Sequence, residues 1–207
     1  MPTSYKLTYF DVRALGETAR LLFHYAGVQF EDNRITHEQW AALKPTMPFG
    51  QVPVLQVDGH TIPQSFAIYR FLANEFGLAG KTNVEKADLD AIADSFKDFY
   101  DEAKNYIYVV CGFREGDADA MYKAHFVPAV EKFFPIYEKV LAESRNGFFV
   151  KGGISWVDFY VANSLLTLTN LKADVLDKYP HLKKLKETVH SLPQLKEYVT
   201  KRPETKA

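Results

Sequence analysis

The chain has 207 residues, of which 47% are hydrophobic and 14% aromatic, enough to build a sizeable buried core in one domain or two small ones. Its 25 basic and 26 acidic residues give a formal charge of −1, which excludes the strongly basic surface typical of nucleic-acid-binding proteins. There is no apolar signal region in the opening MPTSYK, no run of roughly 18 apolar residues that would span a membrane, and only one cysteine, so we expect a cytoplasmic protein without internal disulfides or membrane partners.

The first half of the N-terminal region predicts a β-α-β unit. Residues 5–10 alternate in the period-2 manner of a short strand, which places Tyr9 near its carboxyl end. Residues 16–26 carry apolar side chains at helical spacing, and Gly27 is expected to end that helix. Residues 28–35 then predict a second strand, parallel to the first.

The second half predicts a hairpin followed by a helix. Residues 38–50 contain two prolines and a glycine and predict at most a short helical turn around Trp40. Two short apolar runs flank Asp58-Gly59, a dipeptide typical of tight hairpin turns. A helix is expected from Ser65, as its N-cap, to Gly77. The simplest assembly is a thioredoxin-like sheet with two parallel and two antiparallel strands.

Strand signals nearly vanish after a polar stretch at 77–88, which is the expected domain boundary. Apolar residues at spacings of three and four predict a long helix in 89–110, whose buried stripe should include Leu89, Ile92 and Phe96. Further helices are expected in 124–144, 157–171, 181–192 and 194–202. We therefore expect an α/β domain over residues 1–78 and an all-helical domain over residues 79–207.

Several local motifs have a structural and a functional interpretation. Pro53 suits an edge strand or a cis peptide bond. Ser65 after Gln64 suits simple helix capping, or a helix N-terminus that receives a carboxylate. Ser155 and Asp158 form a capping-box pattern, for which we favour the structural interpretation.

No cofactor motif is found. The six histidines have no metal-binding spacing, and neither a GxGxxG nor a Walker A motif occurs, so we expect no metal site and no bound nucleotide.

The chain resembles the cytosolic glutathione transferases over nearly its whole length. The resemblance rests on five stretches that occur in order with matching gaps: YKLTYFDVR, PFGQVPVLQVDG, IPQSFAIYRFLA, DAIADSFKDF and ISWVDFY. It is greatest to the sigma class, which includes the hematopoietic prostaglandin D synthases, and in particular to its nematode members. The resemblance implies a thioredoxin-like domain that binds glutathione as co-substrate, a helical domain that lines the pocket for hydrophobic electrophiles, and a homodimer.

The resemblance also implies roles for individual residues. Tyr9 matches the catalytic tyrosine, whose hydroxyl donates a hydrogen bond to the glutathione sulfur and so lowers the pKa of the thiol. Asp98 matches an acid that reaches the γ-glutamyl amine bound by the neighbouring subunit. Gln64 and Ser65 match the pair that holds the γ-glutamyl carboxylate. The other glutathione contacts implied are Trp40 and Lys44 at the glycyl end, Gln51, and Val52 with a cis Pro53 at the cysteinyl part.

The chain departs from the family pattern at three places. Where many relatives read RGRAE, this chain reads RALGE, so Arg13 is retained and Leu15 replaces a second arginine that helps to activate the thiol. Gln51 stands where the prostaglandin D synthases have a lysine, and Lys97 interrupts the acidic spacing of their divalent-ion site.

The electrophile pocket is less readable from the sequence. For each candidate, a role in ordinary core packing is as plausible as a role in the pocket, because aromatic residues at helical spacing more often belong to the core than to a binding site. The candidates by position are Phe10, Val12, Arg13, Leu15, Tyr106 and Tyr160, with the segment near Tyr198. Cys111 is expected to be buried or incidental, since the reacting thiol belongs to the substrate.

Three functions remain open. We favour a glutathione transferase, of which peroxidase and prostaglandin D synthase activities are specialisations. The alternative is a non-enzymic ligandin that binds haem or other flat apolar molecules. A structural descendant without turnover, as among cephalopod lens crystallins, is disfavoured because Tyr9, Gln64, Ser65 and Asp98 are retained.

Overall fold

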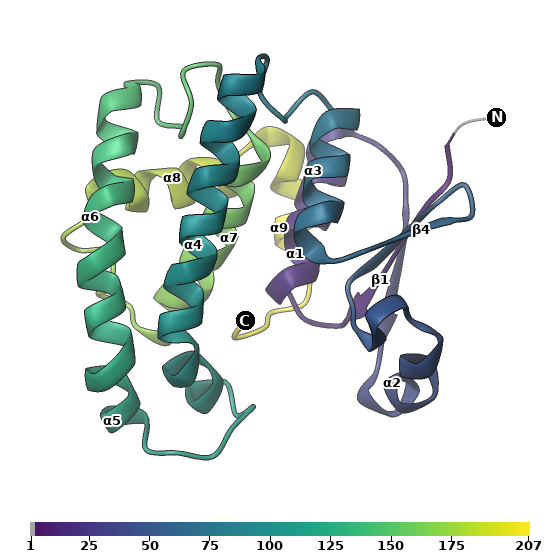
Figure 1. Cartoon of the computed structure of the whole chain (residues 1–207), viewed down its shortest axis with the longest axis horizontal. Helices are drawn as coiled ribbons and strands as arrows, with labels where there is room; N and C mark the ends of the chain where they lie inside the picture. The colour runs from purple at the N-terminus through teal and green to yellow at the C-terminus, as the bar shows by residue number, and fades with distance from the viewer. Residues whose placement is uncertain (1–2) are drawn as a thin grey trace. The chain divides into compact units, whose positions relative to one another are not determined.

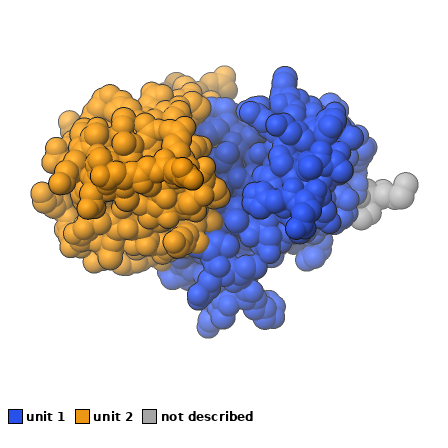
Figure 2. Space-filling model, turned by 90° about the horizontal axis from the view of Figure 1, so that it is seen from below, with its two compact units in different colours: residues 1–79, 190–205 blue, residues 80–189, 206–207 orange. Residues whose placement is uncertain are grey.

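The computed structural model describes residues 3–207 and groups them into two compact units (Figures 1 and 2). Unit 1 contains the described residues up to Ala79 together with His190–Thr205. Unit 2 contains Gly80–Val189 with Lys206–Ala207. The chain therefore returns to unit 1 after completing the helices of unit 2.

Unit 1 is built on a four-stranded sheet. Its strands are β1 (Tyr5–Phe10), β2 (Glu31–Ile35), β3 (Val54–Val57) and β4 (His60–Pro63), in the order β2-β1-β3-β4. β1 runs parallel to β2 and antiparallel to β3, and β3 pairs antiparallel with β4. This arrangement confirms the predicted thioredoxin-like sheet.

Two helices pack together on this sheet, α1 (Ala14–Ala26) and α3 (Ser65–Glu75) (Figure 1). α1 ends, as predicted, at Gly27, whose φ of +66° is a conformation that glycine adopts without strain. The predicted hairpin is also confirmed, because Asp58 and Gly59 both have positive φ, 47° and 84°, between β3 and β4.

The prediction for the segment after β2 is wrong. Instead of a short turn, α2 (His37–Leu43) forms, followed by 3₁₀ turns at Lys44–Thr46 and Pro48–Gly50. α2 begins with a capping box: the Gln39 N–H donates to Thr36 Oγ1 at 3.2 Å, and the Thr36 N–H donates to Gln39 Oε1 at 2.8 Å. Both prolines lie beyond the end of α2, so they terminate the helix without disrupting it.

Unit 2 contains α4 (Asn83–Val110), α5 (Ala118–Met121), α6 (Val127–Ser144), α7 (Trp156–Leu171) and α8, which runs over Pro180–His190 and ends where the chain leaves the unit. A π-helical turn, Tyr122–Phe126, precedes α6. α4 contacts both α6 and α7 through its buried stripe, in which Ala93 takes the place predicted for the half-buried Ile92. In the returning segment, the 3₁₀ turn Pro193–Leu195 contacts α1 and leads into α9 (Lys196–Lys201).

The start of α7 is a buried capping box, as predicted. Asp158 Oδ2 accepts hydrogen bonds from the Ser155 N–H and the Ser155 hydroxyl, each at 2.7 Å. Asp158 Oδ1 accepts a third hydrogen bond from the Phe149 N–H at 3.0 Å. Burial raises the pKa of Asp158 to about 6, although these hydrogen bonds oppose the rise.

Within residues 3–207, none of the helices combines the length and apolar character that a bilayer crossing requires.

Candidate functional site

A cavity of about 350 Å³ lies in unit 1. Its wall is formed by the end of β1, the start of α1, α2 with the turns after it, the residues before β3, and the start of α3. Its volume is within the range of small-molecule binding sites. Among the lining residues are these candidates for contact with glutathione: Trp40, Lys44, Gln51, Val52, Pro53, Gln64 and Ser65.

One side of the cavity is the N-terminus of α3. Ser65 is the first residue of this helix and not its N-cap, which corrects the sequence prediction; Gln64 occupies the cap position, with φ +73° and ψ 121°. The Gln64 side chain does not cap the helix, and its Nε2 instead donates to Gln51 Oε1 at 3.1 Å. The N–H groups of the first helical turn carry a partial positive charge and can therefore donate hydrogen bonds to an anionic group of a ligand.

The conformation of Gln64 is strained. A non-glycine residue at such a φ costs on the order of 1 kcal/mol, and strain of this kind is concentrated at ligand sites.

The segment before β3 offers main-chain groups to the cavity. The Val52–Pro53 peptide bond is cis, the form that the resemblance implies. The strand register of β3 begins at Val54, so Val52 precedes the residues that pair with β1 and β4. The main chain of Val52 can therefore pair with an extended ligand.

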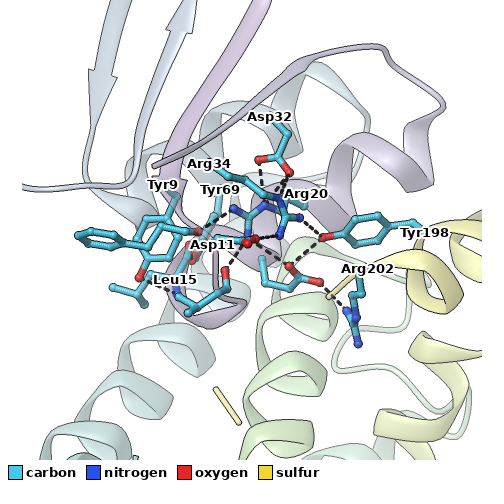
Figure 3. Close-up of polar contacts among 12 residues, drawn as sticks. Tyr9, Asp11, Leu15, Arg20, Asp32, Arg34, Tyr69, Tyr198 and Arg202 are labelled. Carbon is cyan, nitrogen blue, oxygen red and sulfur yellow. Dashed lines mark hydrogen bonds and ion pairs between the residues drawn. The ribbon is translucent and has the colours of Figure 1, made fainter. Parts of the chain in front are cut away.

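Tyr9 lies at the end of β1 beside the first turn of α1 (Figure 3). Its side chain is almost buried, at 7% exposure, and its hydroxyl oxygen accepts a hydrogen bond from the Leu15 N–H at 3.3 Å. A phenol that accepts such a hydrogen bond can still donate its own proton. Tyr9 can therefore act as a hydrogen-bond donor to an anion.

A buried arginine that was not predicted from the sequence holds the loop after Tyr9. The Arg20 side chain has no exposed surface, and its guanidinium carbon lies 6.0 Å from the centre of the Tyr9 ring. Arg20 donates to the main-chain oxygens of Val12 at 2.7 Å and Phe10 at 3.2 Å, and to both carboxylate oxygens of Asp32 at 3.0 and 3.1 Å (Figure 3). These bonds fix the connection from β1 to α1.

Glu17 joins this cluster to the returning C-terminal segment. Its carboxylate, 1% exposed, accepts hydrogen bonds from the Tyr198 hydroxyl at 2.9 Å and from Arg202 Nη1 at 2.5 Å, and Arg20 Nη1 lies 3.4 Å away. Burial and the nearby Glu17 charge raise the pKa of Tyr198, which keeps this phenol a donor at neutral pH. The i, i+3 spacing of Glu17 and Arg20 within the apolar face of α1 was the signal in the sequence.

The candidates for the electrophile pocket in unit 1 differ in position. Phe10 and Leu15 line the cavity, and the Phe10 ring packs edge-on to Trp40 with 5.7 Å between ring centres. The main-chain oxygen of Val12 accepts a hydrogen bond from Arg20. Arg13, only 4% exposed, donates from Nη2 to the main-chain oxygen of Thr205 at 3.1 Å.

The candidates in unit 2 lie in its core or on its surface. Tyr106 is 6% exposed and packs against Phe126, with 4.7 Å between ring centres. Tyr160 is 5% exposed and packs edge-on against Phe96 at 5.5 Å. Asp98 is an exposed residue of α4, and the half-buried Cys111 follows the last residue of that helix.

Across the part of the chain that the structure describes, no three His, Cys, Asp or Glu side chains gather closely enough to hold a metal ion.

Comparison with known proteins gives concordant matches. The family model described as "Glutathione S-transferase, N-terminal domain" matches residues 5–74, and "Glutathione S-transferase, C-terminal domain" matches residues 97–202. Glutathione S-transferase 1 of Ascaris suum is 49% identical over 201 residues, which are 97% of this chain and 98% of that protein. A Nu-class GST from Haemonchus contortus has a TM-score of 0.90 at 45% identity, covering 99% of this chain and all of that chain. The prostaglandin synthase D of Nilaparvata lugens has a TM-score of 0.87 at 37% identity, covering 97% of this chain and 100% of that chain.

Proposed function

This chain belongs to the glutathione S-transferases, enzymes that conjugate glutathione to electrophiles, and we propose that its Tyr9 stabilises the reacting thiolate in the cavity of unit 1. The observation that carries the proposal is the lining of this cavity, which unites polar groups suited to each end of glutathione. Tyr9 is not itself a lining residue, but its hydroxyl is hydrogen-bonded to Leu15, which is one. In this proposal residues 1–78 form the glutathione-binding domain. The helical domain, residues 79–207 without the segment 190–205 that belongs to unit 1, contributes the edges of Tyr106 and Tyr160 to the electrophile pocket.

Each part of glutathione has a partner in this proposal. The α3 N-terminus, with Gln64 and Ser65, receives the γ-glutamyl carboxylate. The Val52 main chain before Pro53 pairs with the cysteinyl part, and Gln51 stays beside Gln64. Trp40 and the Lys44 ammonium contact the glycyl end, where the lysine balances the carboxylate charge.

Tyr9 acts on the sulfur. Its hydroxyl donates to the thiolate, and the thiol proton leaves to solvent. The thiolate then forms the carbon–sulfur bond with the electrophile, whose leaving group departs with its bonding electrons. Lowering the thiol pKa by about two units requires about 2.7 kcal/mol of preference for the thiolate. One hydrogen bond to a charged group contributes about 1.5–3 kcal/mol, so Tyr9 can provide most of that preference.

We further propose a cytoplasmic homodimer in which Asp98 serves the site of the neighbouring subunit. Asp98 is exposed on α4, where a second copy can approach it. Phe49 is 75% exposed in the turn before Gly50, and a large apolar side chain of this kind suits a subunit interface.

Substitution of Tyr9 by phenylalanine should lower kcat/KM for 1-chloro-2,4-dinitrobenzene at least about tenfold, because the missing hydroxyl stabilises only the thiolate. Glutathione affinity, measured by calorimetry at a pH below both thiol pKa values, where the hydroxyl has no thiolate to stabilise, should change less than about twofold. Tyr25→Phe, which removes the phenol hydroxyl of a tyrosine in α1, is the matched control and should turn over at the wild-type rate. Equal turnover by wild type and Tyr9→Phe would refute the role of Tyr9. Binding without turnover in the wild type would support the haem-binding alternative, and a haem titration would then follow.

Substitution of Asp98 by alanine should weaken glutathione binding about tenfold, since a hydrogen bond to a charged group is lost. The melting temperature should stay the same because Asp98 is exposed. Asp88→Ala, which removes another exposed carboxylate of α4, should bind normally. Unaltered glutathione affinity in Asp98→Ala, or a monomer by light scattering in the wild type, would count against the shared site.

A further inference from the structure

Tyr69 of α3 holds the main chain that contacts the Tyr9 hydroxyl. The Tyr69 side chain is fully buried, and its hydroxyl donates to the Leu15 main-chain oxygen at 2.5 Å (Figure 3). The Leu15 N–H in turn donates to the Tyr9 hydroxyl at 3.3 Å. Leu15 therefore links a buried phenol of α3 to the phenol at the end of β1 through its main chain alone.

The Leu15–Gly16 main chain also lies tightly against the Tyr9 ring. A Cβ atom on Gly16 would stand 2.7 Å from Tyr9 Cγ, closer than real Cβ atoms come to a neighbour, and 3.0 Å from Tyr9 Cβ, which is also tight. Only glycine fits here. Because close-packed interiors transmit small displacements, a shift of this main chain would move the Tyr9 ring.

Tyr69 also lies on the same helix as a second residue of the cavity wall, Ser65. Burial raises the pKa of Tyr69, and hydrogen bonding with Thr18 and, to a smaller extent, Ser65 offsets part of that rise. The Tyr69 phenol thus stays protonated at neutral pH and remains a hydrogen-bond donor to the Leu15 main-chain oxygen. Ser65 lines the cavity at the first turn of the same helix, one turn before Tyr69.

We propose that Tyr69 is a positioning residue for thiol activation. It keeps the Leu15 N–H within hydrogen-bonding distance of the Tyr9 hydroxyl, and it fixes the first turn of α3, which contains Ser65, relative to Leu15. A hydroxyl that accepts a hydrogen bond is polarised and donates its own proton more strongly. Loss of the Tyr69 hydroxyl therefore weakens the hydrogen bond from Tyr9 to the sulfur. The inference rests on the proposed function of Tyr9, because Tyr69 acts on the thiol only through it.

The test is the pH dependence of kcat/KM for 1-chloro-2,4-dinitrobenzene at saturating glutathione, compared between wild type and Tyr69→Phe. The apparent pKa of the bound thiol should rise by about half a unit, which leaves about threefold less thiolate at pH values below it. At pH values above both pKa values, the rates should agree within about twofold. Tyr137→Phe is the matched control, since Tyr137 is a buried tyrosine of unit 2 whose hydroxyl lies 3.1 Å from Ser95 Oγ; it should keep the wild-type profile.

The outcomes separate this inference from the role of Tyr9. An unchanged apparent pKa in Tyr69→Phe overturns the positioning role, and so does a loss of rate that is equal at every pH. If Tyr9→Phe raises the pKa and Tyr69→Phe does not, only the inference about Tyr69 fails. If neither raises it, the proposed function of Tyr9 fails first.

If Tyr69→Phe does not fold, Tyr69→4-fluorophenylalanine carries the test, because the fluorine fills the volume of the hydroxyl but donates no hydrogen bond to the Leu15 main-chain oxygen. A wild-type pH profile in that variant would then overturn the coupling.

Discussion

Replacement of Arg20 by methionine is expected to lower the free energy of unfolding by about 3 kcal/mol, the low end of the range for breaking a buried ion pair. The Arg20 and Glu17 side chains are 0% and 1% exposed, so the variant leaves Glu17 buried with Arg202 as its remaining cation. It also leaves the main-chain oxygens of Phe10 and Val12 without their guanidinium donor. Urea denaturation followed by circular dichroism measures this loss.

Two control variants make the Arg20 result interpretable. Arg20→Lys keeps the charge but lacks the planar fork that reaches Asp32 and both main-chain oxygens, so an intermediate loss is expected. Lys201→Met removes a cation from an exposed pair with Glu197, which should cost less than about 0.5 kcal/mol. An Arg20→Met variant as stable as Lys201→Met would show that the buried cluster does not stabilise the fold.

Replacement of Asp158 by alanine is expected to destabilise the protein by about 3–4 kcal/mol, or to lower the melting temperature by roughly 10 °C. The change removes the acceptor of three buried hydrogen bonds, two from Ser155 and one from the Phe149 N–H. Each buried donor left unpaired costs about 1–3 kcal/mol. Ser155→Ala loses only one of these bonds and should cost about 1 kcal/mol.

The stability difference between wild type and Asp158→Ala should depend on pH. The pKa of Asp158 is about 6 in the folded protein against 3.8 for an ordinary aspartate, so the folded state binds more protons between these values. Wild-type stability from this group therefore increases as pH falls through about 6 and is complete below about 4, a gain of up to about 3 kcal/mol. The alanine side chain of the variant does not titrate, so the difference should grow on acidification. A difference that shrinks as pH falls would contradict the raised pKa.

Local patterns predicted the fold well because each depends on neighbours in the sequence. The alternation of residues 5–10 and the Asp58-Gly59 turn predicted the strands of unit 1, and the Ser155–Asp158 spacing predicted the start of α7. The length of α2 was underestimated because two prolines outweighed the Thr36–Gln39 capping pattern before them.

Features that depend on distant parts of the chain could not be predicted in this way. The return of residues 190–205 to unit 1 brings Tyr198 and Arg202 to Glu17, more than 180 residues earlier. The contact from Tyr69 to Leu15 arises from packing between α1 and α3, and the positive φ of Gln64 has no local signal, so a single sequence displays neither. Of these residues, Gln64 and Leu15 line the cavity, where local sequence preferences give way to the requirements of a site.

Direct titration of the bound glutathione thiolate is the best test of whether Tyr9 holds it. Wild type and Tyr9→Phe would each be saturated with glutathione, and the ultraviolet absorption of the bound thiolate would be followed against pH. If Tyr9 holds the thiolate, the midpoint should lie about two units below the ordinary thiol value of about 8.5 in the wild type, and near 8.5 in Tyr9→Phe. The same midpoint in both proteins would contradict it.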